Sequence, residues 1–136
     1  MIEGTTDSEL MFNLALTFGL ESDPIAALER MTGFVEVVGH RNGIQYPLQM
    51  TLGLSDGQRL FAVRYSSEQQ SRSLYHSGDI AALKEVSSSL RGIADDARAI
   101  VCEPLSQMSK MWEPVPESSV IVVDSGKLAT QPFNPR

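Results

Sequence analysis

The chain has 136 residues, of which 42% are hydrophobic, and it carries a formal net charge of −6. This length is typical of one domain, and this hydrophobic content is sufficient for a buried core. The acidic balance and the lack of clustered Lys and Arg argue against a nucleic acid partner, because phosphate binding needs clustered positive charge. No apolar run approaches the roughly 20 residues of a membrane span, so we expect no membrane partner.

The N-terminal segment and the cysteine content indicate a cytoplasmic protein without a metal or a cofactor. Residues 1–4 contain no basic region followed by an apolar stretch, so we expect no signal peptide. Cys102 is the one cysteine, which excludes an internal disulfide and a cysteine-based zinc site. His40 and His76 lie far apart in the sequence and cannot form a metal site alone. The single cysteine fits a reducing compartment.

A first amphipathic helix is predicted close to the N-terminus. The segment Thr6-Asp7-Ser8-Glu9 has the pattern of a capping box, with Thr6 at the N-cap and Glu9 three residues later. Apolar residues then recur with a period near 3.6 as far as Phe18. Gly19 follows and can end the helix.

A second helix is predicted to follow directly. Asp23 can cap it, and Pro24 suits its first position. Gly33 weakens the helix interior by roughly 1 kcal/mol relative to alanine. We expect the helix to end at Gly39 and Asn42-Gly43 to form a turn.

The period of the apolar residues changes to two after the second helix. Leucine, methionine and tyrosine alternate with polar or small residues over 46–54, which predicts a half-buried strand. Ser55-Asp56-Gly57-Gln58 predicts a tight turn, and alternation over 61–65 predicts the return strand, with Arg64 on the opposite face. These segments form an antiparallel hairpin.

The rest of the chain contains short apolar runs and proline-rich connections. Residues 78–90 are ambiguous, 103–116 are expected to be a loop that holds Trp112, and 129–136 are expected to be a tail with little to bury. Short strands are expected at 73–76, 99–102 and 120–123. Two helices followed by antiparallel strands indicate the α+β class.

Several motifs together resemble a known family. Gly4-Thr5-Thr6-Asp7-Ser8-Glu9, at a helix start, resembles the Thr-Asp-Ser-Glu segment of class II glutamine amidotransferases, which are N-terminal-nucleophile hydrolases. The chain is most similar to small stand-alone amidotransferase-like proteins related to the ergothioneine-pathway γ-glutamyl hydrolase. The further motifs, in the order of that group, are Ser55-Asp56-Gly57, Ser87-Ser88-Ser89, Cys102-Glu103-Pro104-Leu105 and Trp112-Glu113-Pro114-Val115-Pro116. The resemblance covers residues 4–127.

The resemblance implies a fold and a substrate site. The fold would be part of a four-layer αββα sandwich. Asp7, with Thr6 beside it, would bind the α-amino group of glutamine or of a γ-glutamyl small molecule, since a carboxylate is a natural partner for an ammonium group. The plainer alternative is that Thr6-Asp7-Ser8-Glu9 caps a helix and does nothing more.

The chain departs from the family pattern at the reacting groups. The family nucleophile is a cysteine that becomes N-terminal when the initiator Met is removed, whereas position 2 here is Ile2. The family also has a substrate-binding arginine and an oxyanion-hole Asn-Gly pair ahead of the aspartate, and Asn42-Gly43 comes after it. The resemblance therefore implies that residues 1–128 are the C-terminal portion of such a domain. We expect no catalytic residue and no activity in this chain alone.

Two functions remain open from the sequence. The first is a fragment of an amidohydrolase that cleaves γ-glutamyl amides. The second is a non-catalytic module that forms a homodimer or pairs with a missing N-terminal half, because an uncovered apolar sheet face favours association. Cys102 follows an apolar run and is expected to be buried and inert, while His40 and His76 are expected to have surface or packing roles.

Overall fold

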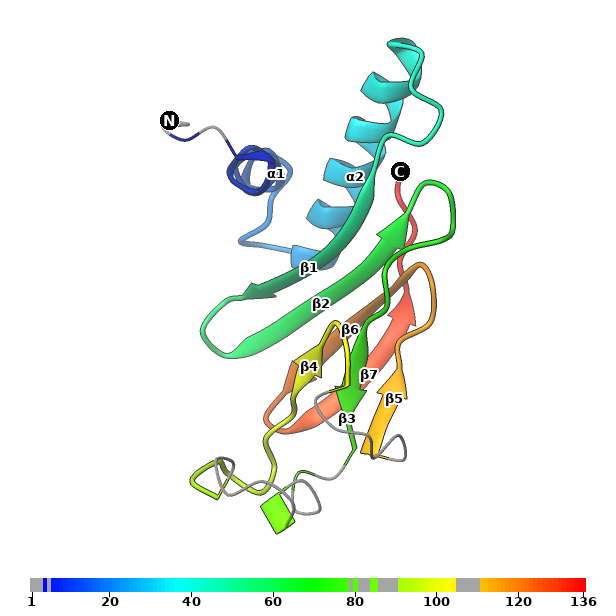
Figure 1. Cartoon of the computed structure of the whole chain (residues 1–136). Helices are drawn as coiled ribbons and strands as arrows, with labels where there is room; N and C mark the ends of the chain where they lie inside the picture. The colour runs from blue at the N-terminus through cyan, green and yellow to red at the C-terminus, as the bar shows by residue number, and fades with distance from the viewer. Residues whose placement is uncertain (1–3, 5, 79, 81–83, 86–90, 105–110) are drawn as a thin grey trace.

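The computed structural model describes residues 4, 6–78, 80, 84–85, 91–104 and 111–136. In this part of the chain two helices come first and seven strands follow (Figure 1). The elements are α1 (Asp7–Thr17), α2 (Pro24–Arg41), β1 (Gln49–Ser55), β2 (Arg59–Ser66), β3 (Tyr75–Ser77), β4 (Ile100–Val101), β5 (Trp112–Pro114), β6 (Ser119–Asp124) and β7 (Lys127–Pro132). This order confirms the predicted α+β class.

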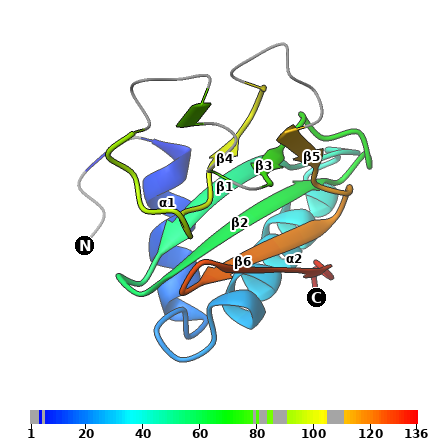
Figure 2. The ribbon, with the colours of Figure 1, turned by 90° about the horizontal axis from the view of Figure 1, so that it is seen from below.

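The strands form two antiparallel sheets. The larger sheet has the order β1-β2-β6-β7 and the smaller one has the order β4-β3-β5. Both helices lie on one face of the larger sheet, and the smaller sheet lies on its other side (Figure 2). The described residues therefore form helix, sheet and sheet layers, which are three of the four layers in an αββα sandwich. No helix in this part of the chain is long and apolar enough to cross a membrane.

Both helices begin where the sequence predicts. The Thr6 hydroxyl accepts a hydrogen bond from the Glu9 N–H at 3.3 Å, which confirms the N-cap of α1. Asp23 caps α2 in the same way, because its Oδ1 accepts from the Ala26 N–H at 3.1 Å. Between them, Gly19 has a φ of 93°, a left-handed conformation that glycine adopts without strain.

The C-terminal end of α2 differs from the prediction. The helix continues through Gly39 and ends at Arg41, and Asn42 and Gly43 form the expected turn. A Cβ atom on Gly39 would lie 2.4 Å from the Pro47 side chain. Gly39 is therefore required by the close approach of the following loop and does not end the helix.

Two apolar clusters hold the layers together. Side chains alternate along β2, so that Val63 and Tyr65 face the helices and Ala62 faces the smaller sheet. The cluster under the helices contains Ala15, Leu20, Ala27, Leu28, Met31, Met50, Val63, Tyr65, Val120 and Phe133. The cluster on the other face contains Ala62, Leu74, Val115 and Ile121.

The predicted hairpin is confirmed, although its first strand begins later than expected. β1 and β2 pair from Gln49 opposite Ser66 to Ser55 opposite Leu60. Tyr46 lies ahead of β1 and is 50% exposed. Gly57, with a φ of 89°, supplies the left-handed conformation that the turn needs.

The turn of this hairpin carries a carboxylate whose pKa is shifted. The N–H groups of Arg59 and Gln58 both donate to Oδ1 of Asp56, and the Arg59 side chain pairs with its Oδ2. The Arg59 N–H, then the Gln58 N–H, lower the pKa of Asp56 from 3.8 to about 2. A depressed folded-state pKa adds stability above the unfolded pKa, and that stability is lost as the pH falls through the folded pKa.

Asp56→Asn is therefore expected to reduce the acid sensitivity of folding between about pH 4 and pH 2. Asparagine suits the same turn, so the hairpin should persist at neutral pH. Urea unfolding at several pH values in this window measures the effect. An equal acid dependence in the two proteins would contradict the expectation.

The smaller sheet includes a strand that the sequence did not predict. Trp112 was expected in a loop but begins β5, which pairs with β3, and its side chain is 5% exposed. It packs in a small cluster with Ile80. β3 overlaps the strand predicted at 73–76, whereas most of the ambiguous segment 78–90 lies outside the described residues.

The C-terminal segment belongs to the sheet and to the core. The prediction that 129–136 are a tail with little to bury is wrong, because β7 pairs with β6 from Lys127 to Pro132. Phe133 follows and is only 2% exposed. Its ring packs edge-on against that of Tyr65, with 5.7 Å between the ring centroids.

The end of the chain then docks on α2. The Asn134 N–H donates to Oε1 of Glu29 at 2.9 Å, and the Arg136 guanidinium lies 3.4 Å from Oε2 of Glu29. A Cβ atom on Gly33 would lie 2.6 Å from the Arg136 carbonyl oxygen. Gly33, which the sequence marks as a weak point in the helix, is thus the residue that allows this close approach.

Candidate functional site

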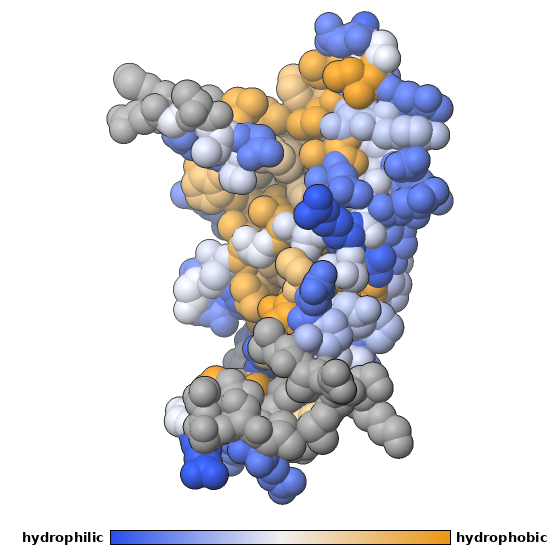
Figure 3. Space-filling view, in the orientation of Figure 1, coloured by the Kyte–Doolittle hydropathy of each residue, from blue (hydrophilic) through white to orange (hydrophobic). Residues whose placement is uncertain are grey.

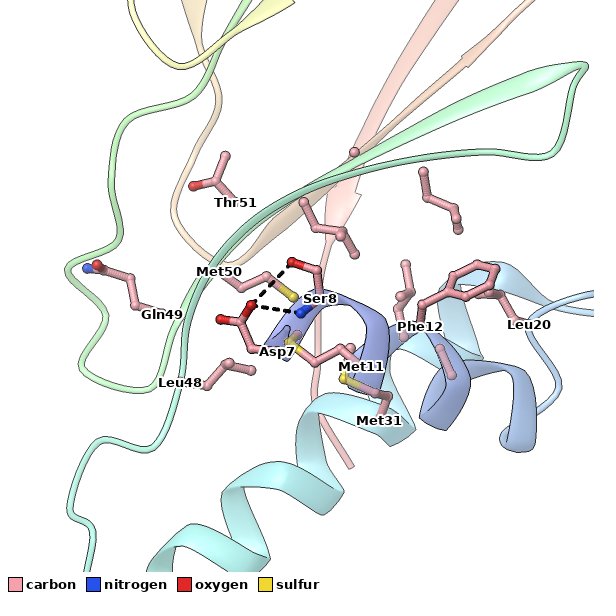
Figure 4. Close-up of a pocket in the computed structure, with 15 residues that line it drawn as sticks. Asp7, Ser8, Met11, Phe12, Leu20, Met31, Leu48, Gln49, Met50 and Thr51 are labelled. Carbon is pink, nitrogen blue, oxygen red and sulfur yellow. Dashed lines mark hydrogen bonds between the residues drawn. The ribbon is translucent and has the colours of Figure 1, made fainter. Parts of the chain in front are cut away.

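A groove lies between α1 and the edge strand β1 (Figure 4). Its volume is about 370 Å³. Its lining is mainly apolar. The apolar side chains in it are Met11, Phe12, Ala15, Leu20, Leu28, Met31, Leu48, Met50, Leu52 and Leu54. A concave apolar site with a few polar groups is the usual form of a small-molecule site. We refer to it as the α1–β1 groove.

Asp7 lies in the wall of this groove, at the first position of α1. Oδ1 of Asp7 accepts hydrogen bonds from the Ser8 N–H at 2.7 Å and from the Ser8 hydroxyl at 3.3 Å. Figure 4 shows the Asp7 carboxylate between α1 and the beginning of β1, near Leu48. The side chain is exposed, so a ligand can reach it from solvent.

The charge in the groove favours a cation. Among the described residues that line it, Asp7 is the one with a formal charge, and Ser8, Gln49 and Thr51 supply uncharged polar groups. An ammonium group can donate a charge-assisted hydrogen bond to the Asp7 carboxylate. A small ligand with an amino group and a short aliphatic chain would match both the charge and the apolar lining.

Thr6 is next to Asp7 but is not among the residues that line the groove. Its hydroxyl is occupied with the Glu9 N–H, which fixes the start of α1 and thus the position of Asp7. A substrate-binding role for Asp7 and Thr6 stays a prediction. In the geometry, Asp7 is available for direct contact, whereas Thr6 acts on Asp7 through the helix start.

The prediction that Cys102 is buried is wrong. β4 contains only Ile100 and Val101, and Cys102 lies just beyond it in an exposed bend. Because β4 ends at Val101, Cys102 is not part of the strand and is not buried with the apolar residues that precede it. The Ser73 hydroxyl donates to the Cys102 carbonyl at 2.9 Å.

Cys102 lies in a second cavity of about 700 Å³, separate from the α1–β1 groove. Its lining comprises Gln49, Thr51, Arg72, Ser73, Cys102 and Glu103. Gln49 and Thr51 line both cavities, so the two adjoin along β1. Asp7 and Cys102 do not line a common cavity.

The histidines lie apart from the groove. His40 is exposed near the end of α2, where its Nε2 lies 3.1 Å from the Gln45 carbonyl oxygen. His76 is in β3, with its Nε2 3.9 Å from Oε2 of Glu113. Within the described residues, no group of three or more His, Cys, Asp or Glu side chains could hold a metal ion.

The fold is similar to that of a solved structure. No protein-family model matches the chain, and no curated protein sequence matches it significantly. Among solved structures, the chain is similar to a glutamine aminotransferase class-II domain protein from Silicibacter pomeroyi, with 31% sequence identity and a TM-score of 0.80. The match covers 98% of this chain and 54% of that one, so the chain spans about half the length of this neighbour.

This comparison supports a glutamine amidotransferase-like fold of the class II type. It agrees with the α+β architecture, in which two helices precede antiparallel sheets. It also agrees with the sequence resemblance, which covers residues 4–127.

Proposed function

We propose that this chain is the substrate-binding portion of a class II glutamine amidotransferase-like amidohydrolase, in which Asp7 binds the α-amino group of glutamine or of another γ-glutamyl amide. The observation that carries the proposal is that Asp7 is the charged residue among the described residues that line the α1–β1 groove. The structural likeness over 98% of the chain supports the same assignment. The apolar lining leaves room for the aliphatic part of the substrate.

Hydrolysis by such a domain requires a nucleophile. In the family that the chain resembles, a cysteine thiolate attacks the amide carbon, the amine leaves with a proton from the enzyme, and water then cleaves the thioester. Cys102 is the one cysteine of this chain and does not line the groove with Asp7. We therefore expect residues outside this chain to supply the nucleophile, and we expect this chain alone to release no ammonia from glutamine.

A second candidate function is a non-catalytic interaction module. Both helices expose large apolar side chains, and Figure 3 shows apolar surface on the side where the helices lie. The exposed residues are Leu10, Phe12, Leu16, Phe34, Val37 and Val38. Such a surface favours a homodimer or a partner that completes the domain. Light scattering of the purified chain tests this, because a monomer at high concentration would contradict a stable homodimer.

Asp7→Asn is expected to weaken glutamine binding by at least about tenfold, since a hydrogen bond to a charged group contributes roughly 1.5–3 kcal/mol. NMR titration of the chain with L-glutamine measures the affinity, and ammonia release is followed in the same samples. Asp124→Asn is the matched control, because the Ser125 hydroxyl donates to Asp124 as the Ser8 hydroxyl donates to Asp7.

The Asp124 variant should bind glutamine with the same affinity as the unchanged chain, since Asp124 is the last residue of β6 and does not line the groove. Equal affinities of the Asp7 and Asp124 variants would contradict the assigned role of Asp7. Ammonia release that is lost in Asp7→Asn would show that the chain carries its own nucleophile, against the proposal.

A further inference from the structure

The outer edge of β1 has no partner strand among the described residues. β1 is the first strand in the order of the larger sheet, so β2 is the one described strand that pairs with it. The Ser67 N–H donates to the Leu48 carbonyl, and Leu48 stands opposite Ser67 in the hairpin register. In an antiparallel ladder the hydrogen-bonded pairs alternate, so the even-numbered residues of β1 bond to β2. The backbone groups of Gln49, Thr51 and Gly53 therefore point away from the sheet.

This edge lacks the features that usually prevent strand pairing. The opposite edge strand, β7, carries the charge of Lys127 and ends in Pro132, whose position in the register points outward. Lysine and proline on an edge strand discourage pairing with another chain. The outward positions of β1, by contrast, are glutamine, threonine and glycine. No hydrogen bond joins their backbone groups to another described residue.

The same edge opens into the α1–β1 groove. Gln49, Thr51 and Gly53 all line the groove, and across from them α1 contributes Met11 and Phe12. Phe12 is 48% exposed. Figure 4 shows Met11 and Phe12 on the side of α1 that faces the groove, with β1 opposite. The groove thus offers unpaired backbone donors and acceptors along one side and apolar side chains above them.

We propose that the α1–β1 groove accepts an extended strand from another polypeptide segment, which pairs with β1 and buries apolar side chains under α1. An extended strand supplies both kinds of contact. Its backbone can form hydrogen bonds with the outward N–H and C=O groups of β1, and its alternate side chains lie on one face. A small molecule can fill the groove but cannot satisfy a row of backbone groups. The strand carries apolar residues on the face toward the helices and polar residues on the other.

Charge complementarity adds a second requirement. The chain carries a net charge of −6, and Asp7 is the charged residue in the described lining of the groove. A strand with basic residues at its ends therefore suits the site better than an acidic one. The proposal does not depend on the amidohydrolase assignment, since strand pairing at β1 needs no glutamine. Different assays test the two proposals: peptide binding tests strand pairing at β1, and glutamine binding tests the role of Asp7.

The test uses a short capped peptide in which valine and threonine alternate between two terminal lysines. We expect the full chain to bind it and the amide protons of Gln49, Thr51 and Gly53 to exchange more slowly with solvent in its presence. Hydrogen exchange followed by NMR resolves these amides individually. A peptide whose alternate amides are N-methylated should not protect them, because it cannot donate to the edge.

Thr51→Pro removes one outward N–H from β1 and should weaken peptide binding about tenfold. Thr130→Pro is the matched control, because Thr130 is also an exposed threonine whose N–H points outward, on β7. It should leave the peptide affinity unchanged. The N-methylated peptide keeps the test decisive if Thr51→Pro does not fold.

Three outcomes would overturn the proposal. One is the absence of peptide-dependent protection along β1. Another is an equal loss of affinity in the Thr51 and Thr130 variants. The third is protection of Gln49, Thr51 and Gly53 that rises with protein concentration in the absence of peptide, which would identify a second copy of the chain as the occupant.

Discussion

Phe133→Ala is expected to lower the free energy of unfolding by about 3–5 kcal/mol, as for other buried phenylalanines. Phe133 is 2% exposed and belongs to the main core cluster with Met31 and Val120. Its ring also packs edge-on against Tyr65. Removing the ring leaves a cavity where β7 meets α2, so the chain end that docks on Glu29 should loosen as well. Urea unfolding followed by circular dichroism measures the loss.

The matched control is Phe34→Ala. Phe34 lies on α2, is 48% exposed and contacts the Phe18 ring at a centroid distance of 6.0 Å. Truncating it removes less buried surface than truncating Phe133, and alanine favours the helix. We expect a change within about 1 kcal/mol. If the Phe133 variant is no less stable than the Phe34 variant, the C-terminal segment does not contribute to the core as described.

Local signals in the sequence were sufficient for the helices and the hairpin. The helix starts at Thr6 and Asp23 depend on side chains that bond to backbone groups three residues away, so a short segment contains the whole interaction. The hairpin depends on the alternation of apolar residues and on the turn at Gly57. Each of these features is complete within a few residues, and the structure confirms each of them.

Features that depend on distant partners were missed. β7 has few apolar residues, and it forms because β6 offers an edge, while Phe133 is buried because Tyr65 and α2 make a place for it. The position of Cys102 depends on the length of β4, which is set by pairing with β3. Propensity and periodicity contain no information on such pairings.

The candidate site was predictable only in part. The sequence identified Asp7 through the helix cap and the family resemblance, but it did not indicate that β1 lies opposite. Polar and small residues at Gln49, Thr51 and Gly53 alternate with apolar ones, and this pattern predicted a half-buried strand. It did not predict that this strand is an edge strand of the described sheet, because strand order in a sheet is a property of the whole fold.

Arg64→Met is expected to lower the free energy of unfolding by about 2–4 kcal/mol. The sequence indicated only that Arg64 lies on the opposite face of its strand from the alternating apolar residues of 61–65. In the structure its guanidinium donates to the Ser71 hydroxyl at 2.8 Å, to the Arg72 carbonyl at 3.0 Å and to the Val115 carbonyl. It also lies 3.7 Å from the Glu117 carboxylate. One side chain thus joins β2 to the two segments that connect the larger sheet with the smaller one, residues 67–74 and 115–118.

Methionine keeps much of the apolar length of arginine but leaves these acceptors without a donor, and a partly buried Glu117 without a counter-charge. Arg64→Lys should be intermediate, because an ammonium group cannot reach the same set of acceptors as a planar guanidinium. Arg59→Met, on the same strand, is the control: its pair with Asp56 is more exposed than the Arg64–Glu117 pair, and exposed pairs contribute about 0–1 kcal/mol. A loss for the Arg64 variant no larger than that for the Arg59 variant in urea unfolding would contradict the role assigned to Arg64.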